Sequence, residues 1–134
     1  MTRLILFSAA AISLAFALPA LADEPGGYTA QKAPVTGEEV YHQVCQACHM
    51  ADAKGGAGAA TIPALAHNPR LAVPDFVIIT VLKGRGAMPG FDDVLDPAQI
   101  AAVITYVRSH FGNAYTAPVT VGQVKALAGQ KTPP

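Results

Sequence analysis

The segment that most constrains this chain is the run Cys45-Gln46-Ala47-Cys48-His49. It spells C-x-x-C-H, the attachment motif of c-type haem. Two thiols at this spacing can add to the two vinyl groups of one haem, and the histidine that follows can bind the iron as its proximal ligand. The chain has two cysteines in all, so no other thiol competes for this role. The motif therefore predicts one covalently bound haem, around which the chain must fold.

Three other interpretations of the two cysteines are weaker. A thioredoxin-like redox pair is expected beside a βαβ pattern, and none is visible around Cys45. A closed zinc site needs four ligands, but His42, His67 and His110 form no H-x₃₋₅-H pair. A structural disulfide is the remaining alternative for an exported protein. An export signal and a downstream methionine both favour haem instead.

The first 22 residues have the pattern of a secretory signal peptide. Arg3 is followed by the apolar stretch Leu4–Leu18, and Ala20-Leu21-Ala22 is a small-x-small cleavage site. The apolar stretch is shorter than the roughly 20 residues of a membrane-spanning helix. We therefore expect cleavage after Ala22, export to the periplasm, and a mature chain without a membrane span.

Size and charge limit the function further. Removal of residues 1–22 from the 134-residue chain would leave 112 residues, enough for one small domain with a modest core. A bound porphyrin would supply much of that core, so we expect the haem-free mature chain to be largely unfolded. The nine basic and nine acidic residues balance, and loss of Arg3 gives a net charge of −1 before the haem propionates are counted. A nucleic-acid-binding protein would show a basic excess.

The patterns after the leader predict an all-α domain with three to five helices. The expected helices run from Thr36 into the haem motif, over 74–82, from Asp96 to about Gly112, and over 121–127. The third is the clearest, because a capping pattern at Asp96 precedes apolar residues at helical spacing between Ile100 and Val107. Segment 74–82 is rich in β-branched residues, so a strand is the alternative there.

Loops and tails complete the predicted organisation. Residues 23–35 read as a flexible leader, residues 36–128 as the haem domain, and residues 129–134 as a loose tail. Glycines and prolines make 51–73 an irregular loop and 84–95 a second loop between helices.

A second axial ligand for the iron is expected in the later half of the chain. Met1 lies in the signal peptide, and Met50 follows His49 too closely to reach the opposite haem face. Met88 remains, in a glycine-rich loop and followed by proline. His67 is the rival, and its ligation would give a bis-histidine site. With both axial positions filled by the protein, the iron is suited to electron transfer rather than catalysis.

Taken together, these residues resemble the class I c-type cytochromes. The resemblance covers about Thr36 to Gly112, with the C-x-x-C-H motif, Met88-Pro89 and a C-terminal amphipathic helix containing Tyr106 in the family's order. It implies a small cytochrome c fold wrapped around one haem c, with His49 and Met88 as axial ligands. It also implies that the Pro63 carbonyl accepts the proximal histidine N–H and that Leu65 packs on the haem.

The same resemblance implies close packing between the first and last helices of the family's core. Gly37, Tyr41 and Tyr106 match the positions where those helices cross. The implied role is that of an electron carrier without a catalytic centre of its own. The alternative is a haem protein with a labile sixth position, which would bind small ligands or act as a peroxidase.

A weaker resemblance concerns the end of the chain. Ser109-His110-Phe111-Gly112-Asn113, with the short helix after it, is similar to the cytochrome subunits of periplasmic dehydrogenases. That resemblance implies a dehydrogenase as electron donor and an oxidase or another cytochrome as acceptor. Any catalytic centre would then lie on a different polypeptide.

Overall fold

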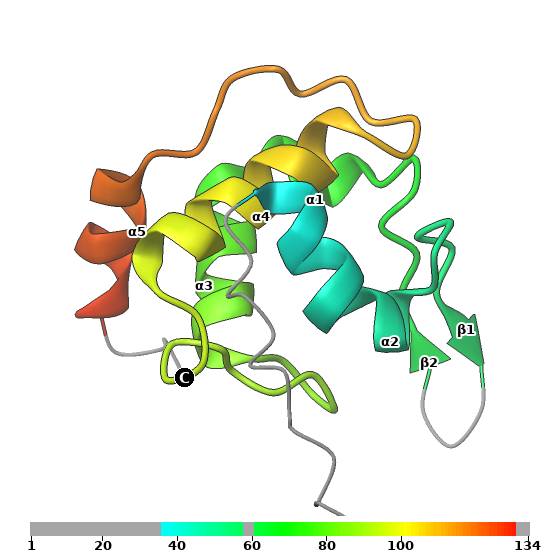
Figure 1. The fold of residues 1–134 in the computed structure, drawn as a ribbon, viewed down its shortest axis with the longest axis horizontal. Helices are drawn as coiled ribbons and strands as arrows, with labels where there is room; N and C mark the ends of the chain where they lie inside the picture. The colour runs from blue at the N-terminus through cyan, green and yellow to red at the C-terminus, as the bar shows by residue number, and fades with distance from the viewer. Residues whose placement is uncertain (1–35, 58–60, 131–134) are drawn as a thin grey trace, which may run out of the picture. The chain divides into compact units, whose positions relative to one another are not determined.

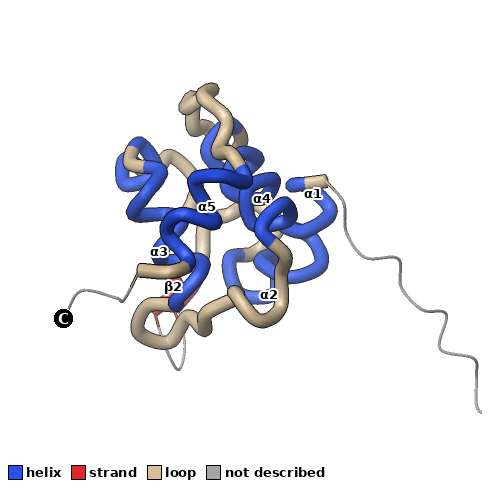
Figure 2. Tube along the Cα trace, turned by 90° about the vertical axis from the view of Figure 1, so that its left-hand side faces the viewer, coloured by secondary structure: helices blue, strands red, loops and turns tan. Residues whose placement is uncertain are grey.

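The structure is a computed structural model that describes residues 36–57 and 61–130. Its elements, in chain order, are α1 (Gly37–Val40), the π-helical turn η1 (Tyr41–Cys45), α2 (Gln46–His49), β1 (Gly56–Ala57), β2 (Thr61–Ile62), the 3-10 helix η2 (Pro69–Ala72), α3 (Pro74–Lys83), α4 (Pro97–Ser109) and α5 (Val121–Ala128). Helices and loops make up nearly all of the described chain (Figures 1 and 2), which confirms the predicted all-α class. The predicted signal peptide (1–22) and leader (23–35) lie outside the described residues, as does most of the predicted tail.

The first three elements form one continuous helical run that leads into the haem motif. Thr36 begins it with a capping box, since its hydroxyl accepts the N–H of Glu39 and the Glu39 carboxylate accepts the N–H of Thr36. Within η1 the N–H of Gln46 donates to the carbonyl of Tyr41, five residues back instead of four. Such a turn accommodates one additional residue in the helix and is often found at functional sites.

The start of α1 crosses α4 at very short range, as the family resemblance implies. A Cβ atom on Gly37 would lie 2.2 Å from the Ala102 carbonyl oxygen and 2.7 Å from the Tyr106 Cβ, so only glycine fits. The rings of Tyr41 and Tyr106 pack across the same crossing, with centroids 5.9 Å apart. Helices far apart in the sequence are thus locked together directly beside the haem motif (Figure 1).

The two longer helices begin where the sequence predicts. Pro74 opens α3 at its first turn, so the alternative of a strand over 74–82 is wrong. Asp96 caps α4 with a complete capping box through Gln99. None of the helices in the described ranges is long and apolar enough to cross a bilayer.

The end of α4 differs from the prediction, because the helix stops at Ser109 and not at Gly112. The Ser109 hydroxyl donates to the carbonyls of Thr105 and Tyr106, which occupies acceptors of the last turn. His110 then adopts an extended conformation, and Phe111 and Gly112 follow with φ of 55° and 78°. The helix therefore ends where the backbone of His110 leaves the helical conformation, before the glycine is reached.

Segment 51–73 is more ordered than an irregular loop. β1 and β2 pair antiparallel, with Gly56 opposite Ile62, and η2 forms a helical turn after Asn68. The strands are two residues each and lack the apolar alternation by which strands are normally recognised. The two strands pair through backbone hydrogen bonds, and these cannot be predicted from the pattern of side chains.

The C-terminal helix α5 packs on α3 and α4 and buries Val124 completely. A buried arginine on α4, Arg108, holds the segment that leads to it. Its guanidinium donates to the carbonyl of Leu71 at 2.8 Å and to that of Ala117 at 2.6 Å. These bonds satisfy an otherwise costly buried cation and join η2, α4 and the chain before α5.

Candidate haem site

His49 ends α2 with its ring buried and anchored. Its Nδ1 lies 3.1 Å from the carbonyl oxygen of Pro63, which accepts the ring N–H. Burial lowers the pKa of His49, while the Pro63 hydrogen bond raises it to a smaller extent. The neutral imidazole thereby holds its proton on Nδ1 and leaves Nε2 free as a metal ligand.

The turn after the motif brings Pro63 to this position. Gly55 has φ of 66° and donates its N–H to the His49 carbonyl at 3.1 Å. A Cβ atom there would lie 2.2 Å from the Ile62 carbonyl oxygen and 2.9 Å from the backbone of Pro63. Gly55 is therefore a functional residue that sequence reasoning missed, although its neighbour Gly56 and the local glycine content were a signal.

Leu65 and Asn113 extend the same support. Leu65 is half-buried against the core, and its N–H donates to the Ala53 carbonyl at 2.8 Å. The buried Asn113 amide donates to the carbonyls of Leu65 and Val107, both at 2.9 Å. Its oxygen accepts the N–H of Asn68 at 2.9 Å. Asn113 was part of the motif used for the family comparison, but nothing in the sequence assigns it this bridging position.

The two cysteines lie on one side of the helical run, three residues apart, and both are free thiols. Cys45 is half-buried and Cys48 exposed. Burial, and secondarily the charge of Cys48, raises the pKa of Cys45 to about 11. These are the two sulfurs that would form thioether bonds to one porphyrin.

Met88 lies in a tightly folded loop between α3 and α4. Its N–H and carbonyl both pair with Arg85, at 3.1 and 2.9 Å. Gly84, with φ of 76°, permits this turn, because a Cβ atom would lie 2.4 Å from the Met88 carbonyl oxygen. Beyond the loop, the Lys83 ammonium binds the Asp92 carboxylate at 2.8 Å and joins its two ends.

His67, the rival ligand, packs against the chain after α4. Its backbone N–H donates to the Phe111 carbonyl at 3.1 Å, and its ring fills the space above Gly112, where a Cβ atom would lie 2.0 Å from the ring. The imidazole is exposed to solvent and packs on the chain after α4. This placement favours Met88 over His67 as the second axial ligand.

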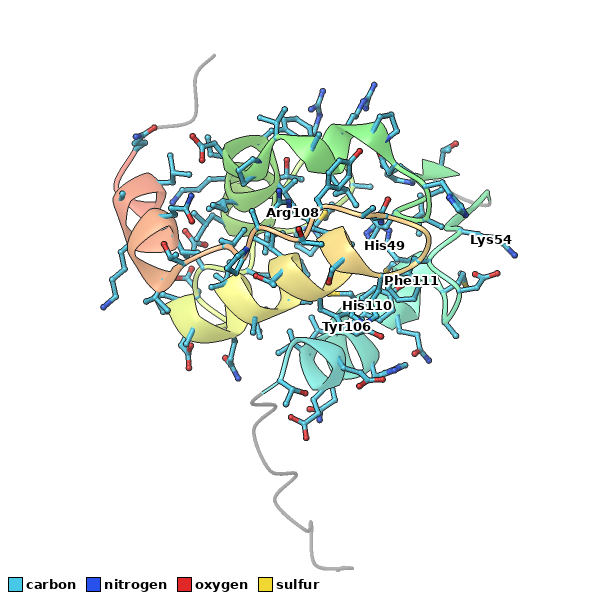
Figure 3. The ribbon with its side chains drawn as sticks, turned by 90° about the horizontal axis from the view of Figure 1, so that it is seen from above. His49, Lys54, Tyr106, Arg108, His110 and Phe111 are labelled. Carbon is cyan, nitrogen blue, oxygen red and sulfur yellow. The ribbon has the colours of Figure 1, made fainter. Side chains whose placement is uncertain are left out.

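Aromatic rings surround the haem motif on the side of α4. Tyr106, His110 and Phe111 lie together beside the first helical run (Figure 3), and the Tyr41 ring contacts that of Phe111 at 4.8 Å. The Tyr41 hydroxyl donates to the Met50 carbonyl at 2.7 Å and so fixes the residue directly after His49. The Tyr41 side chain thus links the packing of α1 against α4 to the conformation of the haem motif.

The residues present fit a covalently bound haem. Two free thiols, an imidazole with Nε2 available and a thioether in a constrained loop are the donors that haem c requires. In the described ranges, no three His, Cys, Asp or Glu side chains gather as they would around a bound metal ion.

Comparison with known proteins gives the same assignment. Residues 32–107 match the family described as cytochrome c oxidase, cbb3-type, subunit III. The cytochrome c subunit of alcohol dehydrogenase (quinone) from Gluconacetobacter polyoxogenes is 31% identical over 114 residues, covering 75% of this chain and 24% of that protein. The gluconate 2-dehydrogenase cytochrome c subunit of Pantoea cypripedii is 34% identical, covering 72% of this chain and 25% of that protein.

A third relative is the fructose dehydrogenase cytochrome subunit of Gluconobacter japonicus, 35% identical over 114 residues, with 73% of this chain and 23% of that protein covered. The chain thus spans about a quarter of the length of these relatives. The predicted family and cofactor are confirmed. The chain belongs to the cytochrome c family described as cytochrome c oxidase, cbb3-type, subunit III, and is a c-type cytochrome, an electron carrier with covalent haem c.

Proposed function

We propose that this chain is a periplasmic monohaem cytochrome whose iron is held between His49 and Met88. When bound, haem c supplies a one-electron Fe(III)/Fe(II) couple, and a Met/His pair raises its potential. Cys45 and Cys48 would tether the ring, the Pro63 carbonyl orients the His49 imidazole, and the backbone bonds between Arg85 and Met88 shape the loop that would present the Met88 thioether. With His49 and Met88 both bound to the iron, no position would be left for a substrate at the metal.

The contact between His49 and Pro63 carries this proposal. A ligand histidine whose Nδ1–H is held by a carbonyl presents Nε2 to the metal in one orientation. The 3.1 Å contact exists in the fold itself, because the Gly55 turn places Pro63 against the ring. The fold of this chain alone therefore orients one of the two proposed axial ligands.

Absorbance spectroscopy of the purified holoprotein tests the ligand pair. Met–Fe(III) ligation gives a weak long-wavelength band, which we expect in the wild type and in His67→Ala but not in Met88→Ala. Met88→Ala should also bind CO rapidly when reduced, because the sixth position opens. A band retained in Met88→Ala and lost in His67→Ala would contradict the proposal. Rapid CO binding by the wild type would point instead to a ligand-binding or peroxidase-like protein.

The partner we propose is a periplasmic dehydrogenase that donates electrons, with an oxidase or another cytochrome as acceptor. The relatives are subunits of alcohol, gluconate and fructose dehydrogenases, and this supports the donor class. Periplasmic fractions that contain a dehydrogenase should reduce the haem of the added cytochrome when the substrate of that dehydrogenase is supplied, and fractions without the dehydrogenase should not. N-terminal sequencing of the purified protein should begin at Asp23, and a start at Met1 would argue against cleavage after Ala22.

A further inference from the structure

Three consecutive carbonyls after β2 each accept a hydrogen bond from a side chain. They belong to a segment without helix or strand, so no ladder of backbone hydrogen bonds fixes the direction of its peptide planes. The carbonyls are those of Pro63, Ala64 and Leu65, and their donors are the His49 ring at 3.1 Å, the Asn68 amide at 2.6 Å and the Asn113 amide at 2.9 Å. Side chains therefore orient this segment, and one of its carbonyls is the partner of the proposed axial histidine.

The opposite edge of the same segment is held by the turn after the haem motif. The N–H groups of Leu65 and Ala66 both donate to the carbonyl of Ala53, at 2.8 and 2.9 Å, and Ala53 is completely buried. The backbone around Leu65 is thus fixed at its N–H groups by this turn and at its carbonyls by the two amides. Without the amides, the carbonyls of the segment would be free to turn away from the His49 ring.

The two asparagines form one unit that is anchored on α4. The Asn113 oxygen accepts the backbone N–H of Asn68 at 2.9 Å, and the Asn113 amide also donates to the Val107 carbonyl on α4 at 2.9 Å. Asn113 is 8% exposed, and a buried amide is stable only in an orientation that satisfies its donors and its acceptor. It lies beyond residues 32–107, the range that matches the family. The position of the segment is thus set from the chain that follows α4.

We propose that Asn68 and Asn113 are positioning residues that hold the Pro63 carbonyl against His49 and thereby set the reduction potential of the haem. The inference rests on the proposed ligation of the iron by His49. A carbonyl that accepts the Nδ1–H of a ligand imidazole makes Nε2 a stronger electron donor, which stabilises Fe(III) relative to Fe(II). A weaker contact between Pro63 and His49 then gives a more positive potential.

Two single substitutions separate positioning from stability. Asn113→Ala removes the whole amide. Asn68→Ser removes the donor to the Ala64 carbonyl but keeps an oxygen for the Arg70 N–H, which the Asn68 side chain accepts at 3.0 Å. Neither substitution changes the charge. Thr120→Ala is the matched control, because the Thr120 hydroxyl caps α5 and its loss lowers stability without removing a bond to the three carbonyls.

The first test follows the Nδ1 proton of His49 by nuclear magnetic resonance of the reduced holoprotein, whose low-spin iron is diamagnetic. In the wild type the Pro63 carbonyl holds this proton, which should exchange slowly with water. It should exchange about tenfold faster in Asn113→Ala and in Asn68→Ser, the change that corresponds to the loss of one or two buried hydrogen bonds. Thr120→Ala should keep the wild-type rate.

The second test is the midpoint potential of the same proteins. Both asparagine variants should shift to more positive values, and Thr120→Ala should match the wild type. The Asn68→Ser, Asn113→Ala double variant should shift no further than the larger single variant, because both amides act through one carbonyl. Denaturant unfolding of all the variants gives the loss of stability against which the shifts are compared.

Exchange rates of the His49 proton that match the Thr120→Ala control would overturn the proposal whether or not the potentials move, because the amides would then not act through Pro63. Faster exchange with unchanged potentials would overturn it as well. If Asn113→Ala yields no holoprotein, Asn68→Ser alone decides the test. A wild type without the long-wavelength Met88 band would contradict the proposed Met88 ligation and not this inference, because the proton is then read in the reduced CO adduct, which is also diamagnetic.

Discussion

Two residues that are not proposed haem ligands, Asn113 and Gly55, support the geometry of the haem site. Asn113 bonds Asn68, Leu65 and Val107 with one amide, and Gly55 permits the turn that places Pro63 on His49. Both act between segments that are far apart in the chain. Their effect is therefore on the geometry of the axial site as much as on stability.

Asn113→Ala should destabilise the holoprotein by about 1–3 kcal/mol, because the buried N–H of Asn68 and two carbonyls lose their partner. Guanidinium unfolding, followed by far-UV circular dichroism, measures the change. The exposed Gln43→Ala should shift the midpoint far less. If the Asn113 and Gln43 variants were equally stable, water would be replacing the hydrogen bonds of the Asn113 amide without loss of unfolding free energy.

Tyr41 makes stability depend on alkaline pH. Burial, with smaller effects from Cys45 and Tyr106, raises its pKa to about 12. Because the folded pKa exceeds the ordinary value of about 10, the hydroxyl contributes fully below pH 10, and its contribution is lost as pH rises toward 12. Tyr41→Phe should be less stable at neutral pH and should lose less stability between about pH 10 and 12. Denaturant midpoints across this range measure both effects, and parallel curves for the two proteins would refute the assignment.

At the scale of elements, the local signals of this sequence were reliable and the long-range ones were not. Thr36 and Asp96 predict the starts of α1 and α4, because a capping box is a pattern of only four consecutive residues. The stop at Ser109, the β1–β2 pair and the bridge of Asn113 depend on partners elsewhere in the fold, and no short pattern encodes them. Elimination of Met1 and Met50 predicts Met88 as a ligand, but the backbone bonds between Arg85 and Met88 that shape its loop follow from the fold and not from a sequence pattern.

The α1–α4 crossing gives a matched pair of glycine substitutions. Gly37→Ala should destabilise the protein by about 1–3 kcal/mol, since its methyl group meets the Ala102 carbonyl. Gly122 lies in the first turn of α5 with its nearest neighbour at 3.8 Å, so Gly122→Ala should be neutral or stabilising. Thermal unfolding of both variants provides the measurement, and similar shifts of the two midpoints would contradict the crossing geometry.

The ion pair at the base of the Met88 loop gives a second element-scale prediction. The Lys83 ammonium holds the pKa of Asp92 below its usual range. Asp92→Asn should loosen the loop, so that added imidazole displaces the sixth ligand at lower concentration at low salt. High salt should remove the difference, because exposed charges are screened. Asp93→Asn changes the neighbouring carboxylate and should behave as wild type. If imidazole displaced the sixth ligand at the same concentration in Asp92→Asn and Asp93→Asn, the Lys83–Asp92 ion pair would have no role in holding the loop.

For the molecule as a whole, we expect the cofactor to complete the core. The proposed ligands come from the first helical run and from the Met88 loop, and segment 63–73 lies between them in the chain. Such an arrangement depends on the haem to connect its parts.

We therefore expect a Cys45→Ala, Cys48→Ala double variant, which cannot bind haem covalently, to lack most of its helical circular dichroism. The wild-type holoprotein should be helical and unfold cooperatively. A haem-free variant with a full helical spectrum would show that the side chains suffice. Mass spectrometry of the wild type should give one added haem per chain.

The π-helical turn η1 lies between the Gly37 crossing and the two cysteines, and it sets the angle between them around the helix axis. One residue of an α-helix corresponds to a rotation of about 100°. If the same residues formed a regular α-helix, the thiols would be rotated by about that angle relative to the Gly37 crossing. Every chemical group of the attachment sequence would be kept, but the thiols would point away from the loop that must face them. Deleting Gln43 would remove the additional residue and the π-helical turn together and leave the thiols at nearly their present angle, so an alignment with distant cytochromes can accept a single-residue gap before the first cysteine.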